Sequence, residues 1–310
     1  MAASAKVVPG VMRQKPITPW LYLAPALIVM IVFIVYPGLN TLYLSFRNVD
    51  NTGWANLACQ AGQPCWGIFE NYRYALTSDV MRTSLLNNLI WIVLMVSATV
   101  LLGLLIATLA DRVKYESLAK AIIFLPMAIS FVGAGVIWKF VYDYGSSQVQ
   151  IGLLNAIITG LGGKPVAWLT VPQVNTICLI VVGVWMWTGF CMTILAAALK
   201  GVPTEILEAA RVDGAREWTV FWQIMVPMIA PTITVVITTM IINVLKVFDI
   251  VYVMTGGNYG TDVIANRMYF EMYKNFQTGR GTAIAIVLVV LIIPVMFVNI
   301  RRFQQQEATR

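Results

Sequence analysis

The sequence predicts an all-α membrane protein with six transmembrane helices, and three observations support this. First, only 11% of the 310 residues are charged and 59% are hydrophobic, whereas an ordinary soluble domain carries about 25% charged residues. Second, the mean hydropathy is +0.78. Third, the chain contains long apolar runs, and a helix needs about 20 such residues to cross a bilayer. The runs are too long for strands and lack the alternation of a β-barrel, which favours helices.

The six apolar runs contain no Asp, Glu, Lys or Arg over a length that can span a bilayer. In chain order they lie within 16–46, at 83–110, at 121–138, within 165–199, within 218–245 and at 281–300. Several of them contain proline, at Pro25, Pro37, Pro126 and Pro231. In a membrane, neighbouring helices or water can satisfy a carbonyl that a proline leaves free. We therefore expect these prolines to kink the spans rather than to end them.

The first run has a competing interpretation as the apolar part of a cleaved signal peptide, since Lys6, Arg13 and Lys15 precede it. The run is longer than the usual apolar region of about 7 to 15 residues, and the stretch 36–38 is not a small-residue cleavage site. We therefore expect a retained first span.

Basic residues near the span ends indicate the orientation of the chain. With the N-terminus in the cytoplasm, just over half of the 21 Lys and Arg residues lie on the inner side. Six spans then place both termini in the cytoplasm. The expected division is a cytoplasmic tail at 1–15, a first transmembrane helix at 16–46, an extracytoplasmic loop at 47–82, a core of five spans at 83–300 with a cytoplasmic loop at 200–225, and a cytoplasmic tail at 301–310. The net charge of +7 belongs to such loops rather than to a nucleic-acid surface, because no basic stripe with interleaved aromatic residues occurs.

The cysteines fall into two pairs. Cys59 and Cys65 lie in the expected extracytoplasmic loop, where a disulfide can persist, and the sequence leaves open whether they are bridged. Cys178 and Cys191 lie in the fourth run and are expected to act as small hydrophobic residues. The chain has no histidine, the commonest metal ligand and general base, and no zinc-type spacing, so no metal site is predicted.

A charged segment between the fourth and fifth runs has the signals of a short helix. Pro203 is suited to a helix start, Glu205 then falls in the first turn, and Gly214 is a plausible stop. Ala209 and Ala210 form a small, smooth patch, which suits docking into a groove of another protein. A second helical piece is expected to begin at residue 216 and to continue into the fifth span.

Residues of this segment and of the following span match a family pattern in register. They are Glu208, Ala209, Ala210, Asp213, Gly214, Ala215, Phe221, Ile224, Pro227 and Pro231. The pattern resembles the cytoplasmic EAA loop of binding-protein-dependent ABC importers of the carbohydrate type. The opening span and "FDIVYVMTGGNYGTD" at 248–262 also look like the first permease subunit of such a pair, of the maltose large-subunit, α-glucoside or glycerol-phosphate type. The family often has glycine and proline where this chain has Asn258 and Tyr259.

The resemblance implies the type I ABC importer permease fold with a cytoplasmic coupling helix. Its ATPase-coupling residues would be Glu205, Glu208, Ala209, Ala210, Arg211, Asp213, Gly214 and Ala215. Glu208 and Arg211 would make polar contacts with the ATPase, the alanines would allow close approach, and Gly214 would permit the turn. The alternative is an amphipathic helix that lies on the membrane surface without docking.

The resemblance also implies a multi-pass protein of the bacterial inner membrane with several partners. They would be a second homologous permease subunit, two copies of an ATP-binding subunit, an extracytoplasmic solute-binding protein and the lipid bilayer, but no nucleic acid. The residues agree, because no phosphate-binding G-x-x-x-x-G-K-[ST] loop occurs and the dipeptide at 163–164 is followed by proline. We expect a non-catalytic subunit that binds no cofactor itself, with ATP and Mg²⁺ on the partner ATPase.

The solute pathway is expected among polar and aromatic residues of the spans that flank the EAA loop, as the resemblance implies. Trp187 and Phe190 of the fourth run offer flat surfaces for a sugar ring. Asn243, Lys246 and Asp249 are spaced three apart and are expected on one helical face. Alternatively, the aromatic residues only pack or belong to an interfacial belt, and Lys246 pairs with Asp249.

The function that the resemblance implies is ATP-driven import of a carbohydrate or polyol, such as an oligosaccharide, an α-glucoside or a glucosylglycerol-like solute. An importer of another small polar solute, such as glycerol phosphate, is the alternative. A membrane-embedded sugar-transfer enzyme is a more distant one, because it would need paired acidic residues or a metal motif near one interface, and the acidic residues here are scattered.

Overall fold

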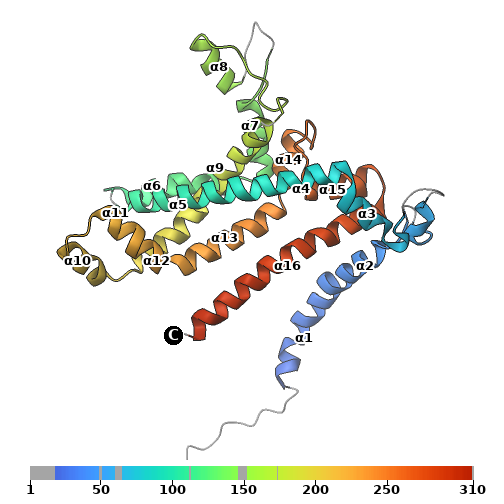
Figure 1. Cartoon of the computed structure of the whole chain (residues 1–310), viewed down its shortest axis with the longest axis horizontal. Helices are drawn as coiled ribbons and strands as arrows, with labels where there is room; N and C mark the ends of the chain where they lie inside the picture. Colours follow the sequence, from blue (N-terminus) through green and yellow to red (C-terminus); the bar gives the residue numbers. More distant parts are fainter. Residues whose placement is uncertain are drawn as a thin grey trace, which may run out of the picture.

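The computed structural model describes residues 18–48, 51–59, 65–111, 113–145, 152–172 and 174–308, and these are almost entirely helical (Figure 1). Within them no β-strand occurs, and one isolated bridge joins Arg47 to Trp54. The α-helices are α1 Thr18–Met30, α2 Tyr36–Leu44, α3 Glu70–Thr77, α4 Asp79–Trp91, α5 Ser97–Ala110, α6 Glu116–Phe124, α7 Phe131–Val141, α8 Leu153–Gly160, α9 Val174–Lys200, α10 Thr204–Val212, α11 Glu217–Thr219, α12 Val226–Met228, α13 Ala230–Leu245, α14 Asp249–Met254, α15 Ile264–Tyr269 and α16 Thr278–Ala308. The predicted all-α class is confirmed, while the predicted tail at 1–15 lies outside the described residues.

Six spans can be assigned within the described residues. Four are continuous helices that are long and apolar enough to cross a membrane: Pro19–Leu44, Asp79–Ala110, Val174–Lys200 and Thr278–Arg301. Two are broken, Glu116–Ala128 with Phe131–Val141 at 97° and Glu217–Met228 with Ala230–Leu245 at 68°. Counted as one span each, the broken pairs bring the total to the six that the sequence predicts.

Two of the four span prolines behave differently from the prediction. Pro126 lies in the 3-10 turn Leu125–Ala128, where the third span breaks, and Pro231 lies in the first turn of α13, directly after the break in the fifth. Proline is best tolerated in a first helical turn, because its missing N–H has no partner there. As predicted, neither proline ends its span, but the helix is broken at or next to it rather than only kinked. Pro25 and Pro37 do lie inside the first span.

The broken third span satisfies its free backbone groups locally. Ile129 and Ser130 have extended backbones, with ψ of 142° and 150°. The Ser130 Oγ then accepts a hydrogen bond of 3.0 Å from the Gly133 N–H and so caps α7. The cap satisfies a backbone N–H at the start of α7 without requiring a water molecule.

The α9 helix is the centre of the bundle, and small residues let its neighbours approach closely. A Cβ on Gly103 of α5 would lie 2.8 Å from the Cβ of Cys191, and one on Gly183 of α9 would lie 2.8 Å from the sulfur of Met95. Cys178 and Cys191 are both free and buried, as the sequence predicts for small hydrophobic residues. Close approach at small residues is the usual basis of helix packing in membranes.

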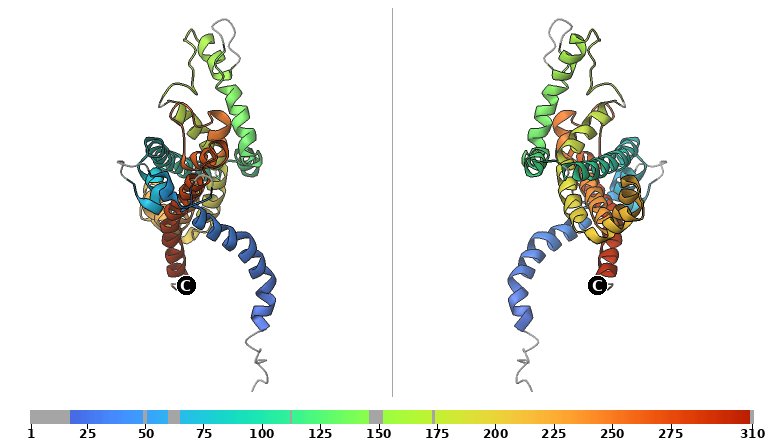
Figure 2. Two further views of the ribbon diagram at one scale, coloured as in Figure 1. Left: turned by 90° about the vertical axis from the view of Figure 1, so that its right-hand side faces the viewer. Right: turned by 90° about the vertical axis from the view of Figure 1, so that its left-hand side faces the viewer.

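The first span stands largely apart from this bundle. Its α1 and α2 curve away from the body, and α2 packs against α16 (Figure 2). None of its most apolar 18-residue window is buried inside the chain.

The two ends of the bundle differ. Helices α10 and α11 lie at one end and α3 and α15 lie towards the other, which we call the α10 end and the α3 end (Figure 1). The α8 helix stands out beyond α7. The fully buried Asn155 holds this arm, since its Nδ2 donates to the Asp143 and Val166 carbonyls at 2.9 Å each, and its Oδ1 accepts from the Val166 N–H at 2.9 Å.

We expect Gly189→Ala to destabilise the protein by about 1 to 3 kcal/mol, because the new methyl group would overpack α9 against the broken third span. Its Cβ would lie 2.6 Å from the Ile123 carbonyl oxygen and 2.7 Å from the Phe124 Cα, which are main-chain atoms that cannot move aside cheaply. The measurement is the melting temperature of the detergent-solubilised protein. Gly38→Ala is the matched control, since nothing lies within 4 Å of its added Cβ. Equal melting temperatures of the two variants would contradict the packing described here.

Candidate functional site

The charged segment between the fourth and fifth spans forms the short helix that the sequence predicts. Helix α10 follows Pro203 (φ −59°), carries Glu205 in its first turn and ends before Gly214 (φ +82°). The left-handed Gly214 lets the chain turn, and the Ala215 N–H donates to the Ala210 carbonyl at 3.0 Å. Arg216 then precedes α11, as predicted for the second helical piece. These local signals mark where the helix begins and ends.

Most of the predicted coupling residues are exposed on α10 and the turn after it. Exposed are Glu205, Glu208, Ala209, Arg211, Asp213 and Gly214, while Ala210 and Ala215 are half-buried. Leu207 packs against the hydrophobic core, which fixes the opposite face of the helix. The structure also exposes Val212 at 86% and Trp218 at 73% beside this surface. The sequence analysis missed these two, although an apolar residue in a charged segment is a recognisable signal.

The end of α10 is closed by an ion pair within the chain. The Arg211 Nε donates to the Glu217 Oε1 at 2.8 Å, across the turn at Gly214. The carboxylate raises the pKa of the Arg211 guanidinium above its ordinary value. Arg211, assigned by the resemblance to contact an ATPase, therefore has a partner in its own chain.

A second ionic group holds the start of the segment. Lys200, the last residue of α9, places its Nζ 2.6 Å from the Glu116 Oε1 and 3.4 Å from the Asp111 Oδ1. Lys120 also pairs with Glu116. Asp111 follows α5 and Glu116 begins α6, so Lys200 joins the ends of the second, third and fourth spans just before α10. We call Lys200, Asp111, Glu116 and Lys120 the ionic clamp.

The predicted aromatic pathway residues meet at the break in the third span. The Phe131 ring at the start of α7 stacks on Trp187 with a centroid distance of 6.0 Å and an interplanar angle of 27°. Phe190 lies edge-on to Trp187 at 5.4 Å. All three are half-buried and pack against the core, so their rings keep some exposed surface. We call them the Trp187 group.

The three predicted polar residues do not share one helical face, so that prediction is wrong. Asn243 is near the end of α13, Lys246 follows that helix, and Asp249 begins α14. The spacing rule fails because the backbone breaks between the two helices. The Asn243 Nδ2 donates to the Thr239 carbonyl at 2.9 Å. Lys246 is exposed, and no salt bridge between it and Asp249 is present among the described residues.

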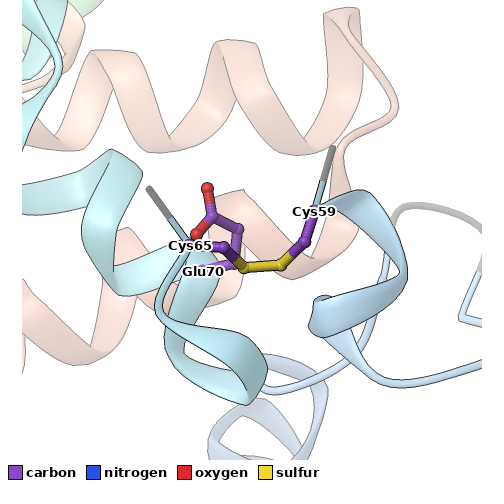
Figure 3. A group of neighbouring side chains, drawn as sticks. All are labelled: Cys59, Cys65 and Glu70. Carbon is purple, nitrogen blue, oxygen red and sulfur yellow. A yellow bond between two sulfur atoms is a disulfide. The ribbon is translucent and has the colours of Figure 1, made fainter. Parts of the chain in front are cut away.

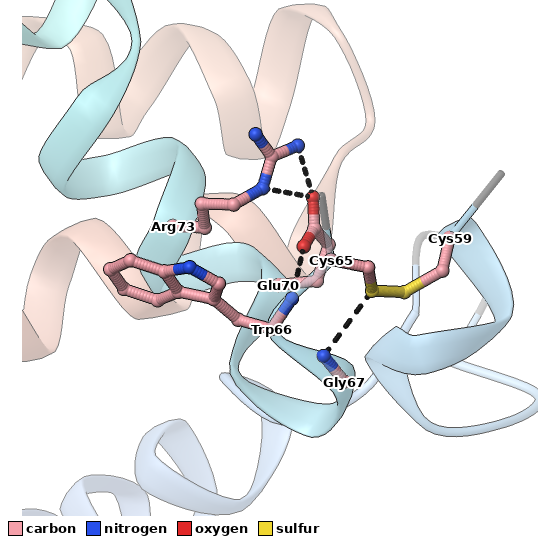
Figure 4. The surroundings of a disulfide bond; sticks show 6 residues. All are labelled: Cys59, Cys65, Trp66, Gly67, Glu70 and Arg73. Atoms are coloured by element: carbon pink, nitrogen blue, oxygen red, sulfur yellow. Dashed lines mark hydrogen bonds and ion pairs between the residues drawn. A yellow bond between two sulfur atoms is a disulfide. The ribbon is translucent and has the colours of Figure 1, made fainter. Parts of the chain in front are cut away.

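Cys59 and Cys65 are joined in the structure, with Cα atoms 5.7 Å apart. Glu70 lies beside them, and the three ligand atoms fall within 4.8 Å of one another (Figure 3). This group does not fit a metal ion, because both sulfurs are used in the disulfide. The Glu70 carboxylate is also engaged, since it accepts from Arg73 at 2.8 Å and from the Trp66 N–H at 3.1 Å (Figure 4). The hydrogen bond from Arg73 holds the pKa of Glu70 below its ordinary value.

Comparison with known proteins gives one family and several full-length relatives. The family model described as "Binding-protein-dependent transport system inner membrane component" matches residues 99–305. The osmoprotective compounds uptake permease protein GgtC of Synechocystis sp. is 52% identical over 94% of this chain and 100% of its own length. The α-glucoside transport system permease protein AglF of Rhizobium meliloti is 46% identical over 92% of this chain and 82% of its own length.

The fold is also similar to that of a solved membrane protein. A chain of a bacterial ABC transporter involved in the import of the acidic polysaccharide alginate gives a TM-score of 0.76, covering 92% of this chain and 95% of that chain. Its sequence identity is 23%, so this similarity concerns the fold alone.

We expect Lys200→Glu to lower the melting temperature, because it places a third negative charge beside Asp111 and Glu116. The double variant Lys200→Glu with Glu116→Lys restores an opposite-charge pair and should recover part of the loss. The loss should shrink in high salt, because these groups are about half-exposed and therefore screened. Melting curves at low and high ionic strength measure both effects. A double variant less stable than both single variants would contradict a direct interaction.

Proposed function

We propose that this chain moves a carbohydrate or polyol across the membrane. The premise is its family: the chain belongs to the inner-membrane components of binding-protein-dependent transport systems. As a member of this family with the type I ABC importer permease fold, the chain is a non-catalytic permease subunit. ATP is hydrolysed by a separate subunit. The six spans of this chain agree with a multi-pass membrane subunit.

The main support for a coupling role is that ion pairs hold both ends of α10. The ionic clamp holds its start, and the Arg211–Glu217 pair closes its end. Glu208 and Ala209 are exposed between these two anchors. A helix that only lies on lipid needs no such anchoring, whereas a helix that transmits force must be attached to the spans that move. This supports docking of α10 in a groove of the ATPase.

In the proposed cycle the ATPase draws α10 inward when it closes on ATP and Mg²⁺, which the partner holds. Glu208, Ala209 and Ala210 form the contact, and Glu205, Asp213 and Ala215 flank it. Gly214 keeps the turn tight. Arg211 serves mainly through Glu217, which it positions beside the contact. The α11–α12 segment then carries the motion across the 68° break into α13.

The proposed assembly contains this chain, a second homologous permease subunit, two ATPase subunits and an extracytoplasmic solute-binding protein. We place the chain in a bacterial inner membrane with both termini in the cytoplasm. The α10 end then faces the cytoplasm, and the α3 end with its disulfide at Cys59 and Cys65 faces outward. Disulfides persist in that compartment, which supports this orientation.

The proposed substrate is a carbohydrate or polyol, and an α-glucoside or a glucosylglycerol-like solute is the narrower choice. Two relatives that match most of this chain support this choice by their names, which refer to osmoprotective compounds and to α-glucosides. The Trp187 group also supports it, because half-exposed aromatic rings suit the apolar C–H face of a sugar ring. Asn243 at the end of α13 adds a polar group to the proposed pathway, and we retain Lys246 and Asp249 as candidates at its outer end.

We expect Glu208→Lys and Gly214→Asp each to abolish copurification of the ATPase subunit. The first reverses a charge in the proposed contact, and the second places a Cβ on a residue with φ +82° and so distorts the turn. Lys164→Glu is the control, since it changes an exposed charge in the distant α8 arm. Pull-down from membranes measures the amount of ATPase per permease. Wild-type amounts in both variants would contradict the docking role of α10.

We expect Trp187→Ala combined with Asn243→Ala to lower solute uptake about ten-fold while the complex still assembles, because the pathway loses a ring surface and an amide. Uptake of labelled maltose and labelled glucosylglycerol into proteoliposomes measures it. Trp20→Ala, a 64% exposed tryptophan of the first span, is the control for loss of a tryptophan outside the pathway. Unchanged uptake by the double variant would remove these residues from the pathway.

A further inference from the structure

A second group of aromatic rings lies between the fifth and sixth spans, away from the Trp187 group. Phe248 precedes α14, Tyr252 lies on it, and their stacked rings have centroids 5.1 Å apart at an angle of 23°. Tyr269 of α15 approaches both, at 5.2 Å from Phe248 and 5.1 Å from Tyr252. Tyr273 follows at 5.2 Å from Tyr269 and is 58% exposed. We call these four residues the Tyr252 group.

The Tyr252 group is not needed to fill the core. The buried side chains of α14 and α15 are not aromatic: they are Ile250, Val251, Met254, Ile264, Ala265 and Asn266. Phe248 and Tyr252 are one helical turn apart and are only half-buried, as is Tyr269. The two helices therefore bury non-aromatic residues on one side and present aromatic rings on a partly exposed side.

The backbone beneath these rings is held by contacts that do not involve them. The Asn88 Oδ1 accepts from the Ile264 N–H at the start of α15, at 2.8 Å. Arg267 pairs with Glu271, which is 1% exposed, and also donates to the Tyr74 hydroxyl at 2.9 Å. The rings thus sit on a frame that is ordered in advance, which lowers the cost of binding a ligand.

The chemistry of the Tyr252 group suits an uncharged polyhydroxyl ring. Its rings offer flat apolar faces, and Tyr252, Tyr269 and Tyr273 add hydroxyls that can donate or accept hydrogen bonds. The neighbouring ionisable residues Lys246 and Asp249 have opposite charges, so the site gains no net charge from them. A sugar ring has the matching form, with an apolar C–H face and a hydroxyl edge.

We propose that the Tyr252 group is a second carbohydrate subsite, nearer the α3 end than the Trp187 group. The inference rests on the proposed function. Helix α14 packs against α7, whose first residue Phe131 belongs to the Trp187 group. A solute released by the binding protein at the α3 end therefore meets the Tyr252 group first and the Trp187 group next.

The test uses the complete importer in proteoliposomes with its binding protein. Labelled maltose and labelled glucosylglycerol are the probes, supplied separately at equal concentration. We expect Tyr252→Ala with Tyr269→Ala to lower uptake of the transported probe about five-fold and to change the maltose-to-glucosylglycerol ratio by about two-fold or more, because the stacked surface differs for the two solutes. Tyr252→Phe keeps the ring and should stay within about two-fold of wild type. Phe276→Ala, a 74% exposed ring of the same segment outside the group, is the control.

Each of the following results would overturn the subsite. Wild-type uptake and ratio in the double alanine variant would overturn the subsite, and so would an equal loss for both probes. Failure of that variant to assemble with its partner subunits would assign the rings to subunit packing and overturn it as well. If wild-type complexes take up neither probe, the proposed function fails, and the inference that rests on it fails with it.

Discussion

The close approach of α9 to its neighbours is the contact on which the rest of the molecule depends. In lipid, helices gain little from the hydrophobic effect when they associate, so tight van der Waals packing must hold the bundle together. Gly103 admits the main chain of α9 to α5, and Gly189 admits the break of the third span to α9. Any side chain at these glycines would meet main-chain atoms. The position of the break, and of the aromatic rings around it, follows from this packing.

The same helix connects the membrane core with α10. It ends at Lys200, whose ammonium group joins the turns at Asp111 and Glu116, and four residues later α10 begins. A displacement of α10 is therefore applied to the ends of three spans together. The exit through α11 and α12 is different, because a 68° break separates it from α13. The start of α10 is thus fixed to the ends of three spans, which form a rigid block. Its end is followed by a segment that is separated from α13 by the 68° break.

Local signals made much of this predictable. Charge-free runs gave the spans, and Pro203 with Gly214 gave both limits of α10. The breaks were not predictable, since whether Pro126 kinks or ends a helix depends on what its neighbours supply, here the Ser130 hydroxyl. Long-range partners were equally hidden. The pairing of Lys200 with residues 84 and 89 positions earlier, and the meeting of Tyr252 with Tyr269, depend on packing that no spacing rule encodes.

Asparagine side chains satisfy the backbone carbonyls of irregular segments beside the membrane spans. Where helices break, unpaired backbone groups are costly unless other groups satisfy them. Asn87 donates to the Gly260 and Asp262 carbonyls at 2.6 and 2.8 Å, and Asn175 donates to the Tyr259 carbonyl at 2.8 Å. Tyr259 is held there at φ +57°, in the left-handed region. The loop between α14 and α15 is thereby fixed to the second and fourth spans. Movement of those spans must move this loop and the rings beside it, which links the α3 end to the same rigid block that holds α10.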